Sequence, residues 1–485
     1  MADLRSTLEA FIATAAQPSL LDNGEEPLRL VPGQWEVREW NGRLVLEAWD
    51  GERSLVRKIL RVAGQRRDRL SLVTERFPKT EAETQIADLA APHAVELRRK
   101  TSRLAFTCRF RLMLAREFPG WRVMEASAEP NLEQSFSPLY TRALLRKGPQ
   151  AVAAIGAPAD SSDPAGIVAQ GLIWLASVRK RERKLTVGSL VYFVPEGMER
   201  APAQRASLLD PRAVTVHVHT YDERDRTAPV DFRDVGNADS ILQPCHRPSS
   251  PNSEPDGLPA MEGVDRVAQA DGTVRFNIRG LEFAQWSGAG LTCGIARKRR
   301  ASLGEVQSMA REIARLRSDA AEDTQHQLYT QFPEGWLESL VRADPQAIDA
   351  TLRSMPLYGQ VPVFNAPGRD VIDLLGVDYE GRLAIVELKV STDVQLPFQA
   401  LDYWLRVNRH LQAGDFERQG YFPGVTLRRD PPRILLVAPG LAFHSSSETV
   451  LGFLQPGIDV TRIGLAEDWR RALRVMFRLR GADQP

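Results

Sequence analysis

Residues 370–403 read DVIDLLGVDYEGRLAIVELKVSTDVQLPFQALDY, and this stretch decides how the C-terminal part of the chain is expected to fold. Two apolar runs, 371–377 and 383–390, are joined by a short polar turn. A three-residue hairpin loop with glycine in its last, left-handed position is a favoured connection, and Tyr-Glu-Gly at 379–381 supplies one. The pattern predicts two antiparallel strands joined by a tight hairpin.

The register of this hairpin follows from centring it on Glu380. Asp373 then lies directly opposite Glu387, and Lys389 shares their face because side chains alternate along a strand. The other face is entirely apolar and comprises Ile372, Leu374, Ala384, Val386, Leu388 and Val390. A slip of one residue would destroy this separation, so the hydrophobic pattern supports the register.

Three charged groups inside an apolar strand pair need a physical reason. Burying a charge costs several kcal/mol unless the charge is paired or binds an ion. A divalent cation would remove the repulsion between Asp373 and Glu387, and a small set of oxygen ligands suits Mg²⁺ or Mn²⁺. Asp370 competes with Asp373 as a ligand but falls on the opposite side of the register. The alternative interpretation is an exposed edge hairpin that carries ordinary surface charges.

At these residues the sequence resembles the PD-(D/E)XK nuclease superfamily, whose pattern is an Asp on one strand and Glu-x-Lys on the next. Asp373 and Glu387-Leu388-Lys389 match that pattern. The resemblance implies a restriction-endonuclease-like α/β fold, a mixed sheet flanked by helices, and metal-dependent hydrolysis of phosphodiester bonds. It also implies that Asp373, Glu387 and the Leu388 carbonyl bind the metal, while Lys389 orients water or stabilises developing negative charge.

Two further elements extend the resemblance. Gln399 and Tyr403 lie four apart on the following helix, like the Gln-x-x-x-Tyr element of the RecB-like and mismatch-endonuclease-like branches, and are implied to contact nucleic acid. The family often adds a Glu on the helix before the first core strand. Glu338 is the best candidate for that ligand, and Glu334 is an alternative. The resemblance covers roughly residues 333–440, and the family acts mostly on DNA.

The chain has 485 residues, which is too long for one core, so several domains are expected. Alternating apolar runs predict strands over residues 28–76, residues 81–118 look helical, and strands and helices alternate from 119 to 225. The expected organisation is a β-rich module (1–80), an α/β domain (81–242), a Pro-rich linker (243–260), a short β segment with a charged helix (261–332) and a nuclease domain (333–485).

The two α/β regions resemble each other weakly in element order, which suggests an internal duplication; the alternative is two unrelated α/β segments. The strand that matches LAIVELKV is AVAAIGAP at 151–158, without Glu-x-Lys. The matching helix has Gln170 but Trp174 where Tyr would stand. The first copy is therefore expected to be a degenerate half that serves as a binding or scaffolding platform, the inactive partner in an internal pseudo-dimer. One active site per chain would then nick, or cut single strands, unless two chains pair as a homodimer.

The composition of the chain limits the classes of protein to which it can belong. The three cysteines lie far apart, and neither a signal peptide nor a membrane span is recognisable, so a cytoplasmic protein is expected. The net charge is +1, but residues 51–200 hold 26 Lys+Arg against 16 Asp+Glu, an excess of 10 that could neutralise phosphates or simply solvate helix faces. The competing function is a non-catalytic nucleic-acid-binding or scaffold protein, or a nuclease subunit that needs a partner.

Overall fold

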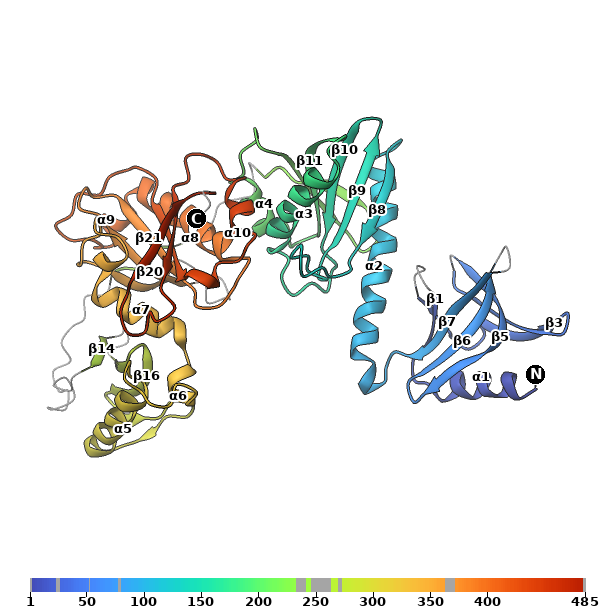
Figure 1. Cartoon of the computed structure of the whole chain (residues 1–485), viewed down its shortest axis with the longest axis horizontal. Coiled ribbons are helices and arrows are strands. Elements are labelled where there is room, and N and C mark those ends of the chain that lie inside the picture. Colours follow the sequence, from blue (N-terminus) through green and yellow to red (C-terminus); the bar gives the residue numbers. More distant parts are fainter. Residues whose placement is uncertain are drawn as a thin grey trace. The chain divides into compact units, whose positions relative to one another are not determined.

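The computed structural model describes residues 2–22, 27–51, 53–76, 80–232, 241–245, 263–268, 273–362 and 371–482, and Figure 1 traces them from the N- to the C-terminus. The chain forms two compact units: unit 1 comprises Met1–Ala203 and Thr215–Asp231, and unit 2 comprises Gln204–Val214 and Phe232–Pro485. Most of the expected Pro-rich linker, from 246 to 260, lies outside the described residues. Over the described ranges, every helix is too short or too polar to cross a membrane.

Unit 1 begins with a seven-stranded antiparallel sheet covered by helix α1 (Ala2–Thr14). Its strands are, in spatial order, β2 (Leu28–Arg29), β1 (Pro18–Asp22), β7 (Thr80–Asp88), β6 (Arg69–Arg76), β5 (Ser54–Arg66), β4 (Arg43–Trp49) and β3 (Trp35–Trp40). The helical expectation for 81–118 is wrong at its start, because β7 pairs with β1 and β6. Sheet pairing overrides the helix propensity of this Glu- and Ala-containing segment.

The second sheet of unit 1 has six strands between two helices. The strands are, in spatial order, β13 (Thr227–Pro229), β12 (Thr215–Tyr221), β11 (Thr186–Pro195), β10 (Gln150–Gly156), β9 (Thr141–Lys147) and β8 (Arg122–Ser127). Helix α2 (Val95–Glu117), which follows the short helix η1 (Pro92–Ala94), packs on one face. Helix α3 (Ile167–Arg181) covers the other, where Gly171 lies against Tyr192. Helix α4 (Arg200–Ala206) follows β11, and its residues from Gln204 on belong to unit 2.

Unit 2 contains a small module that precedes the expected nuclease domain. Its five strands are β14 (Val264–Ala268), β15 (Val274–Ile278), β16 (Leu281–Ser287), β17 (Gly290–Cys293) and β18 (Arg299–Arg300), and its helices are α5 (Leu303–Leu316) and α6 (Gln327–Thr330). Ser302 and Glu305 form a capping box at the start of α5. The β15–β16 turn touches the next helix at Gly335, where a Cβ on Gly280 would come within 2.0 Å of the Gly335 carbonyl oxygen.

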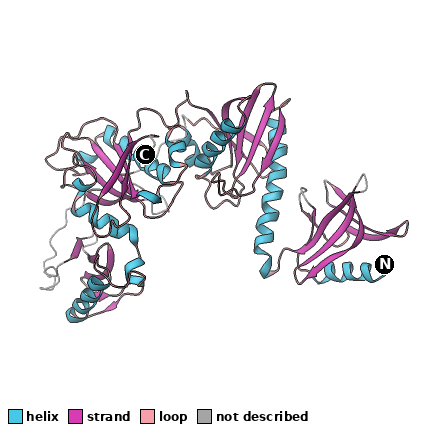
Figure 2. Cartoon of the chain, in the orientation of Figure 1, coloured by secondary structure: helices cyan, strands magenta, loops and turns pink. Residues whose placement is uncertain are grey.

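The C-terminal sheet of unit 2 also has six strands. They are, in spatial order, β19 (Tyr358–Pro362), β20 (Val371–Val377), β21 (Leu383–Leu388), β22 (Arg433–Pro439), β23 (Val460–Leu465) and β24 (Val475–Arg480). The helices are α7 (Pro333–Ala343), α8 (Leu396–Ala413), α9 (Asp415–Arg418) and α10 (Ser447–Leu451), with the short helices η2 (Pro345–Ala347) and η3 (Gly440–Ala442). Figure 2 shows the strands of each six-stranded sheet with helices against them.

The two six-stranded sheets have the same topology. When the strands of each sheet are counted along the chain, the first three are antiparallel neighbours, the third, fourth and fifth are parallel neighbours, and the sixth is antiparallel to the fifth. A helix precedes each sheet (α2 and α7), and another connects the third and fourth strands along the chain (α3 and α8). This agreement is what an internal duplication would produce, although duplication and the domain boundaries stay predictions.

Candidate functional site

The β20–β21 hairpin has the register that the sequence predicts. Leu374 pairs with Val386 and Leu375 with Ile385, while Gly381 closes the loop at φ +88°. Continuing this register by one residue sets Asp373 opposite Glu387. At that point the backbone N–H of Leu388 donates a 2.8 Å hydrogen bond to Oδ2 of Asp373.

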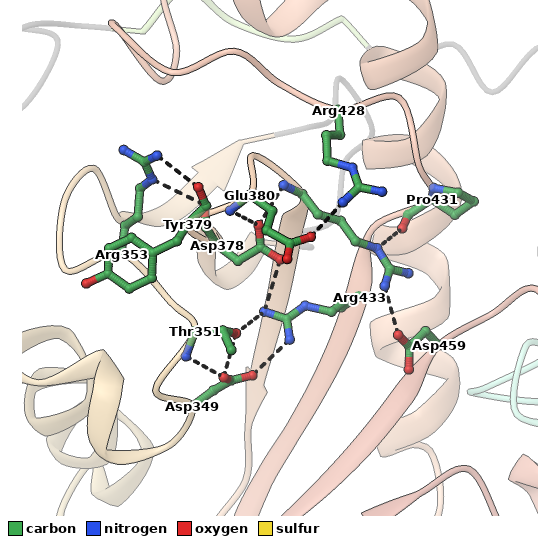
Figure 3. A network of polar contacts seen from close by, with 11 residues as sticks. Asp349, Thr351, Arg353, Asp378, Tyr379, Glu380, Arg428, Pro431, Arg433 and Asp459 are labelled. Carbon is green, nitrogen blue, oxygen red and sulfur yellow. Dashed lines mark hydrogen bonds and ion pairs between the residues drawn. The ribbon is translucent and has the colours of Figure 1, made fainter.

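A network of polar contacts around Asp378 holds the loop end of the hairpin (Figure 3). The Asp378 carboxylate accepts hydrogen bonds from the backbone N–H groups of Glu380 (3.0 Å) and Arg382 (2.8 Å). Arg433 on β22 reaches both Asp378 (3.7 Å) and Asp349 (3.0 Å). These contacts tie the hairpin to the neighbouring strand, so the register at its opposite end is fixed as well.

As the sequence predicts, one face of the hairpin is apolar and the other carries the charged residues. Leu374, Ala384, Val386 and Leu388 pack in one core with Trp336, Leu337 and Val341 of α7. Helix α8 covers the opposite face, which carries Asp373 and Glu387. Because β21 lies between β20 and β22 and all six of its residues are buried, the alternative of an exposed edge hairpin is wrong.

The Asp373–Glu387 pair is electrostatically strained. Burial raises the pKa of Asp373 to about 7, a rise that nearby Glu338 and Glu334 reinforce and the Leu388 N–H opposes. Burial, and secondarily the charge of Asp373, raises the pKa of Glu387 well above its ordinary value. Within the described chain, Oε2 of Glu387 is buried without a hydrogen-bond partner. Two carboxyl groups in this state favour a proton or a cation between them.

Lys389 comes directly after β21, and its N–H donates to the Val437 carbonyl at 3.0 Å. Its ammonium group lies 3.8 Å from Asp393, and its charge lowers the pKa of both Asp373 and Glu387. The structure therefore brings Asp373, Glu387 and Lys389 to one end of the β20–β21 pair.

The charge of Glu338 on α7 raises the pKa of Asp373, but Glu338 has an ion-pair partner of its own. Its carboxylate is ion-paired with Arg342, one helical turn further along α7. Burial raises the pKa of Glu338, and Arg342 partly offsets that rise. This ion pair engages Oε1 of Glu338, so its second carboxylate oxygen remains available as a metal ligand. Glu334, the alternative, also acts on Asp373 through its charge.

Gln399 and Tyr403 lie on α8 as expected. Tyr403 is buried, and Gln399 is partly exposed. Helix α8 packs on β21 and β22, and the indole N–H of Trp404 donates to the Pro432 carbonyl at 2.9 Å. The two residues are thus held by the helix that covers the face of Asp373 and Glu387, while their contact with nucleic acid stays a prediction.

This site can hold a metal ion only through a small number of protein ligands. The described residues contain no group of three or more His, Cys, Asp or Glu side chains placed to hold an ion. Asp370 lies outside the described residues. The unpartnered Glu387 oxygen and the raised pKa of Asp373 are nevertheless what an ion between the two carboxylates would relieve. Mg²⁺ is often bound by one or two carboxylates, with water and phosphate completing its shell.

Sequence reasoning missed two side chains near this site. Asp393 lies four residues after Lys389, inside the stretch quoted first, and only its spacing could have drawn attention to it. His444 follows β22, and its Nδ1 accepts the Ser446 N–H at 3.1 Å. Burial lowers the pKa of His444, while the charge of Asp393 raises it. No local pattern in the sequence connects His444 with Asp393.

The matching positions of the first six-stranded sheet carry different chemistry. Ala157 takes the place of Lys389, since each donates its N–H to the next strand just beyond the strand end. Ile155 then matches Glu387, and its cross-strand partner Arg142 matches Asp373. A buried cation thus stands where the second sheet has a carboxylate.

Arg142 is held by groups of its own sheet. It donates to the carbonyls of Ser137 (3.0 Å) and Glu129 (2.6 Å), and its guanidinium lies 4.4 Å from the centre of the Phe136 ring. Gln170, which matches Gln399, accepts the Ser137 N–H at 3.0 Å. The loop between β8 and β9 therefore fills this position with satisfied hydrogen bonds.

Comparisons with known proteins give two partial likenesses. No family model and no curated protein matches the chain. The structure of EndoMS bound to double-stranded DNA is 17% identical over 41% of this chain and 64% of that chain, with a TM-score of 0.20. A repair endonuclease from Pyrococcus abyssi is 16% identical over 46% of this chain and 72% of that chain, with a TM-score of 0.18.

The chain thus spans less than two thirds of the length of the EndoMS chain. At these TM-scores the likenesses carry no argument about this chain. The structure describes a mixed α/β protein, and the restriction-endonuclease-like fold stays a prediction from the sequence.

Proposed function

We propose that this protein is a metal-dependent nuclease that hydrolyses phosphodiester bonds, with DNA as its substrate. The observation that carries the proposal is the buried pair of Asp373 and Glu387, opposed across a hairpin with Lys389 at its end. Few structural roles explain two carboxyl groups with raised pKa values, one of them with an unpartnered oxygen. DNA is proposed because the superfamily that the sequence resembles acts mostly on DNA.

Each side chain has a role that follows from its position. Asp373, Glu387 and the Leu388 carbonyl would hold Mg²⁺ or Mn²⁺, with the carboxylate of Glu338 as a further ligand. When bound, the ion would polarise the phosphate and lower the pKa of a water molecule. Lys389 would orient the attacking water and stabilise negative charge on the phosphate oxygens. Gln399 and Tyr403 would position the nucleic acid from α8.

The test is cleavage of supercoiled, linear and single-stranded DNA with Mn²⁺ by the wild-type protein and by Glu387→Ala and Lys389→Ala. We expect wild-type cleavage and a loss of at least about a hundredfold in each variant, since each removes a group that acts on the reacting phosphate. Arg428→Ala is the control, because Arg428 pairs with Glu380 and Asp430 at the loop end of the hairpin. Cleavage that survives in Glu387→Ala would refute the assigned site.

The second candidate is a nucleic-acid-binding protein that does not cleave, and the engagement of Glu338 by Arg342 favours it. The two candidates differ in their response to metal. A nuclease core should be stabilised by Mn²⁺, and Asp373→Ala should abolish that stabilisation. DNA binding without either effect would favour the binding protein, whereas Mn²⁺ stabilisation without cleavage would favour a nuclease that needs a partner.

A further inference from the structure

Arg205 belongs to the short segment Gln204–Val214, which is part of unit 2 although the chain on either side of it belongs to unit 1. Its side chain is 7% exposed. The guanidinium forms a two-pronged ion pair with Asp402 on α8, with Nη2 2.7 Å from Oδ2 and Nε 3.1 Å from Oδ1. Such a planar pairing fixes orientation as well as distance.

Arg205 also contacts the helix at two other positions. Its Nη1 donates to Oε1 of Gln395 at 3.3 Å, and its guanidinium carbon lies 5.3 Å from the centre of the Phe398 ring. Gln395, Phe398 and Asp402 are three and four residues apart and form one stripe along the helix. One arginine therefore contacts α8 along almost two turns, next to the stripe that carries Gln399 and Tyr403.

The segment that carries Arg205 is anchored at its other end. Leu209 forms an antiparallel bridge with Leu454, and the Asp210 N–H donates to the Phe453 carbonyl at 2.8 Å. The side chain of Gln455 donates to the Ser207 carbonyl at 2.8 Å. Because these bonds hold the segment to the turn after α10, Arg205 connects α8 to a fixed support.

The opposite side of α8 packs against the sheet through apolar contacts. Ala400, Leu401 and Val407 are fully buried, and Phe398 is buried beneath Arg205. Apolar packing allows small sliding and rotation of a helix, whereas a two-pronged ion pair restricts both. The stripe of Gln399 and Tyr403 is therefore held from two directions.

We propose that Arg205 is a positioning residue for nucleic-acid binding, which sets the rotation of α8 and thereby the placement of Gln399 and Tyr403. The inference rests on the proposed function. It assigns a role in the C-terminal site to a residue that lies far from that site in the sequence. Asp373 and Glu387 lie on β20 and β21, so the inference predicts an effect on substrate binding that is separate from metal binding.

The experiment measures kcat and KM for cleavage of a labelled duplex with Mn²⁺, and Kd for the same duplex with Ca²⁺, in the full-length protein. For Arg205→Ala we expect KM and Kd to rise about tenfold, because small displacements of positioning groups weaken productive binding. We expect kcat to change less than about threefold, since the groups that act on the phosphate are unaltered. Thermal stabilisation by Mn²⁺ should stay at the wild-type value.

Two further variants separate positioning from folding. Arg205→Lys keeps the charge but loses the planar pairing, so it should restore part of the affinity. Asp402→Asn should raise KM as Arg205→Ala does, and the double variant should be no worse than either single one. Asp402→Asn also serves as the test if Arg205→Ala fails to fold.

Arg317→Ala is the matched control. Arg317 at the end of α5 is also a buried arginine, and its guanidinium donates to the backbone carbonyls of Arg279 (3.0 Å), Leu328 (2.8 Å) and Phe332 (2.9 Å), all of them outside α8. Arg317→Ala should lower thermal stability and leave KM and Kd unchanged. An unchanged KM and Kd in both Arg205→Ala and Asp402→Asn, or an equal rise in Arg317→Ala, would overturn the inference. If the wild type neither cleaves DNA nor is stabilised by Mn²⁺, the proposed function fails, and the Kd ratios still decide the role of Arg205.

Discussion

The carboxyl groups of Asp373 and Glu387 hold protons more tightly than free carboxyl groups do, and this gives the site a pH dependence. Asp in an unfolded chain has a pKa of about 3.9, whereas burial raises that of Asp373 to about 7. The metal-free folded state therefore binds the proton more tightly. The Asp373 carboxyl therefore contributes its full stabilisation of the metal-free folded state below a pH of about 4. This stabilisation is lost as the pH rises through about 7.

Metal binding should show the opposite trend, because the cation displaces the same proton. We expect Mn²⁺ affinity to rise between pH 5.5 and 7.5, by about tenfold per pH unit for each proton displaced. The measurement is the shift in Tm caused by Mn²⁺ across this range. Asp373→Asn should remove most of the shift at every pH. A wild-type shift that is constant across the range would contradict the assignment of the carboxyl pair as ligands.

At the scale of the element, the β20–β21 hairpin depends on one close backbone approach. Gly381 has φ +88°, and a Cβ there would lie 2.2 Å from the Thr426 carbonyl oxygen. We expect Gly381→Ala to lower the free energy of unfolding by about 2–4 kcal/mol, since it adds a backbone clash to the cost of a left-handed conformation.

Gly424→Ala is the matched control for that measurement. Gly424 has a similar φ of +76°, but a Cβ there would meet nothing within 4 Å. Gly424→Ala should lower the free energy of unfolding by only about 1 kcal/mol, which is the cost of the left-handed conformation without a clash. Urea denaturation of both variants gives the comparison. Equal losses would mean that the Thr426 contact does not hold the hairpin.

At the scale of the whole molecule, the two six-stranded sheets share a topology but differ in their chemistry. The first has Arg142, Ile155 and Ala157 where the second has Asp373, Glu387 and Lys389. The guanidinium of Arg142 already supplies positive charge at the position that matches Asp373, so no metal ion is needed there. Ile155 and Ala157 offer neither a metal ligand nor a positive charge. We therefore expect one metal site and one catalytic centre per chain.

A chain with one centre should cut one strand at a time. Supercoiled plasmid should pass through the open circular form before linear product accumulates, and one equivalent of the tightly bound Mn²⁺ should disappear in Asp373→Ala. Titration calorimetry and a gel time course give both readouts. A second tight equivalent that survives in Asp373→Ala would mean that the first sheet binds metal. Linear product from the outset would point to paired chains.

The sequence by itself determined the hairpin, its register and the convergence of Asp373, Glu387 and Lys389. These features depend on strand alternation and on one glycine turn, both of which act over a few residues. The same local reasoning failed at β7, because pairing with two other strands overrides the preference of Thr80–Asp88. Glu338 was identified from its helix, but its partner Arg342 was not.

Only the tertiary structure decided which distant residues support the site. The ion pair of Arg205 and Asp402 joins residues 197 positions apart, and His444 lies near Asp393 although no pattern links them. Likewise, Arg142 takes its role from the register of β9 and β10 and from the loop that fills its surroundings. The physical reason is that side-chain pairing across a fold depends on the packing of whole elements, whereas a hairpin is specified by its own neighbouring residues.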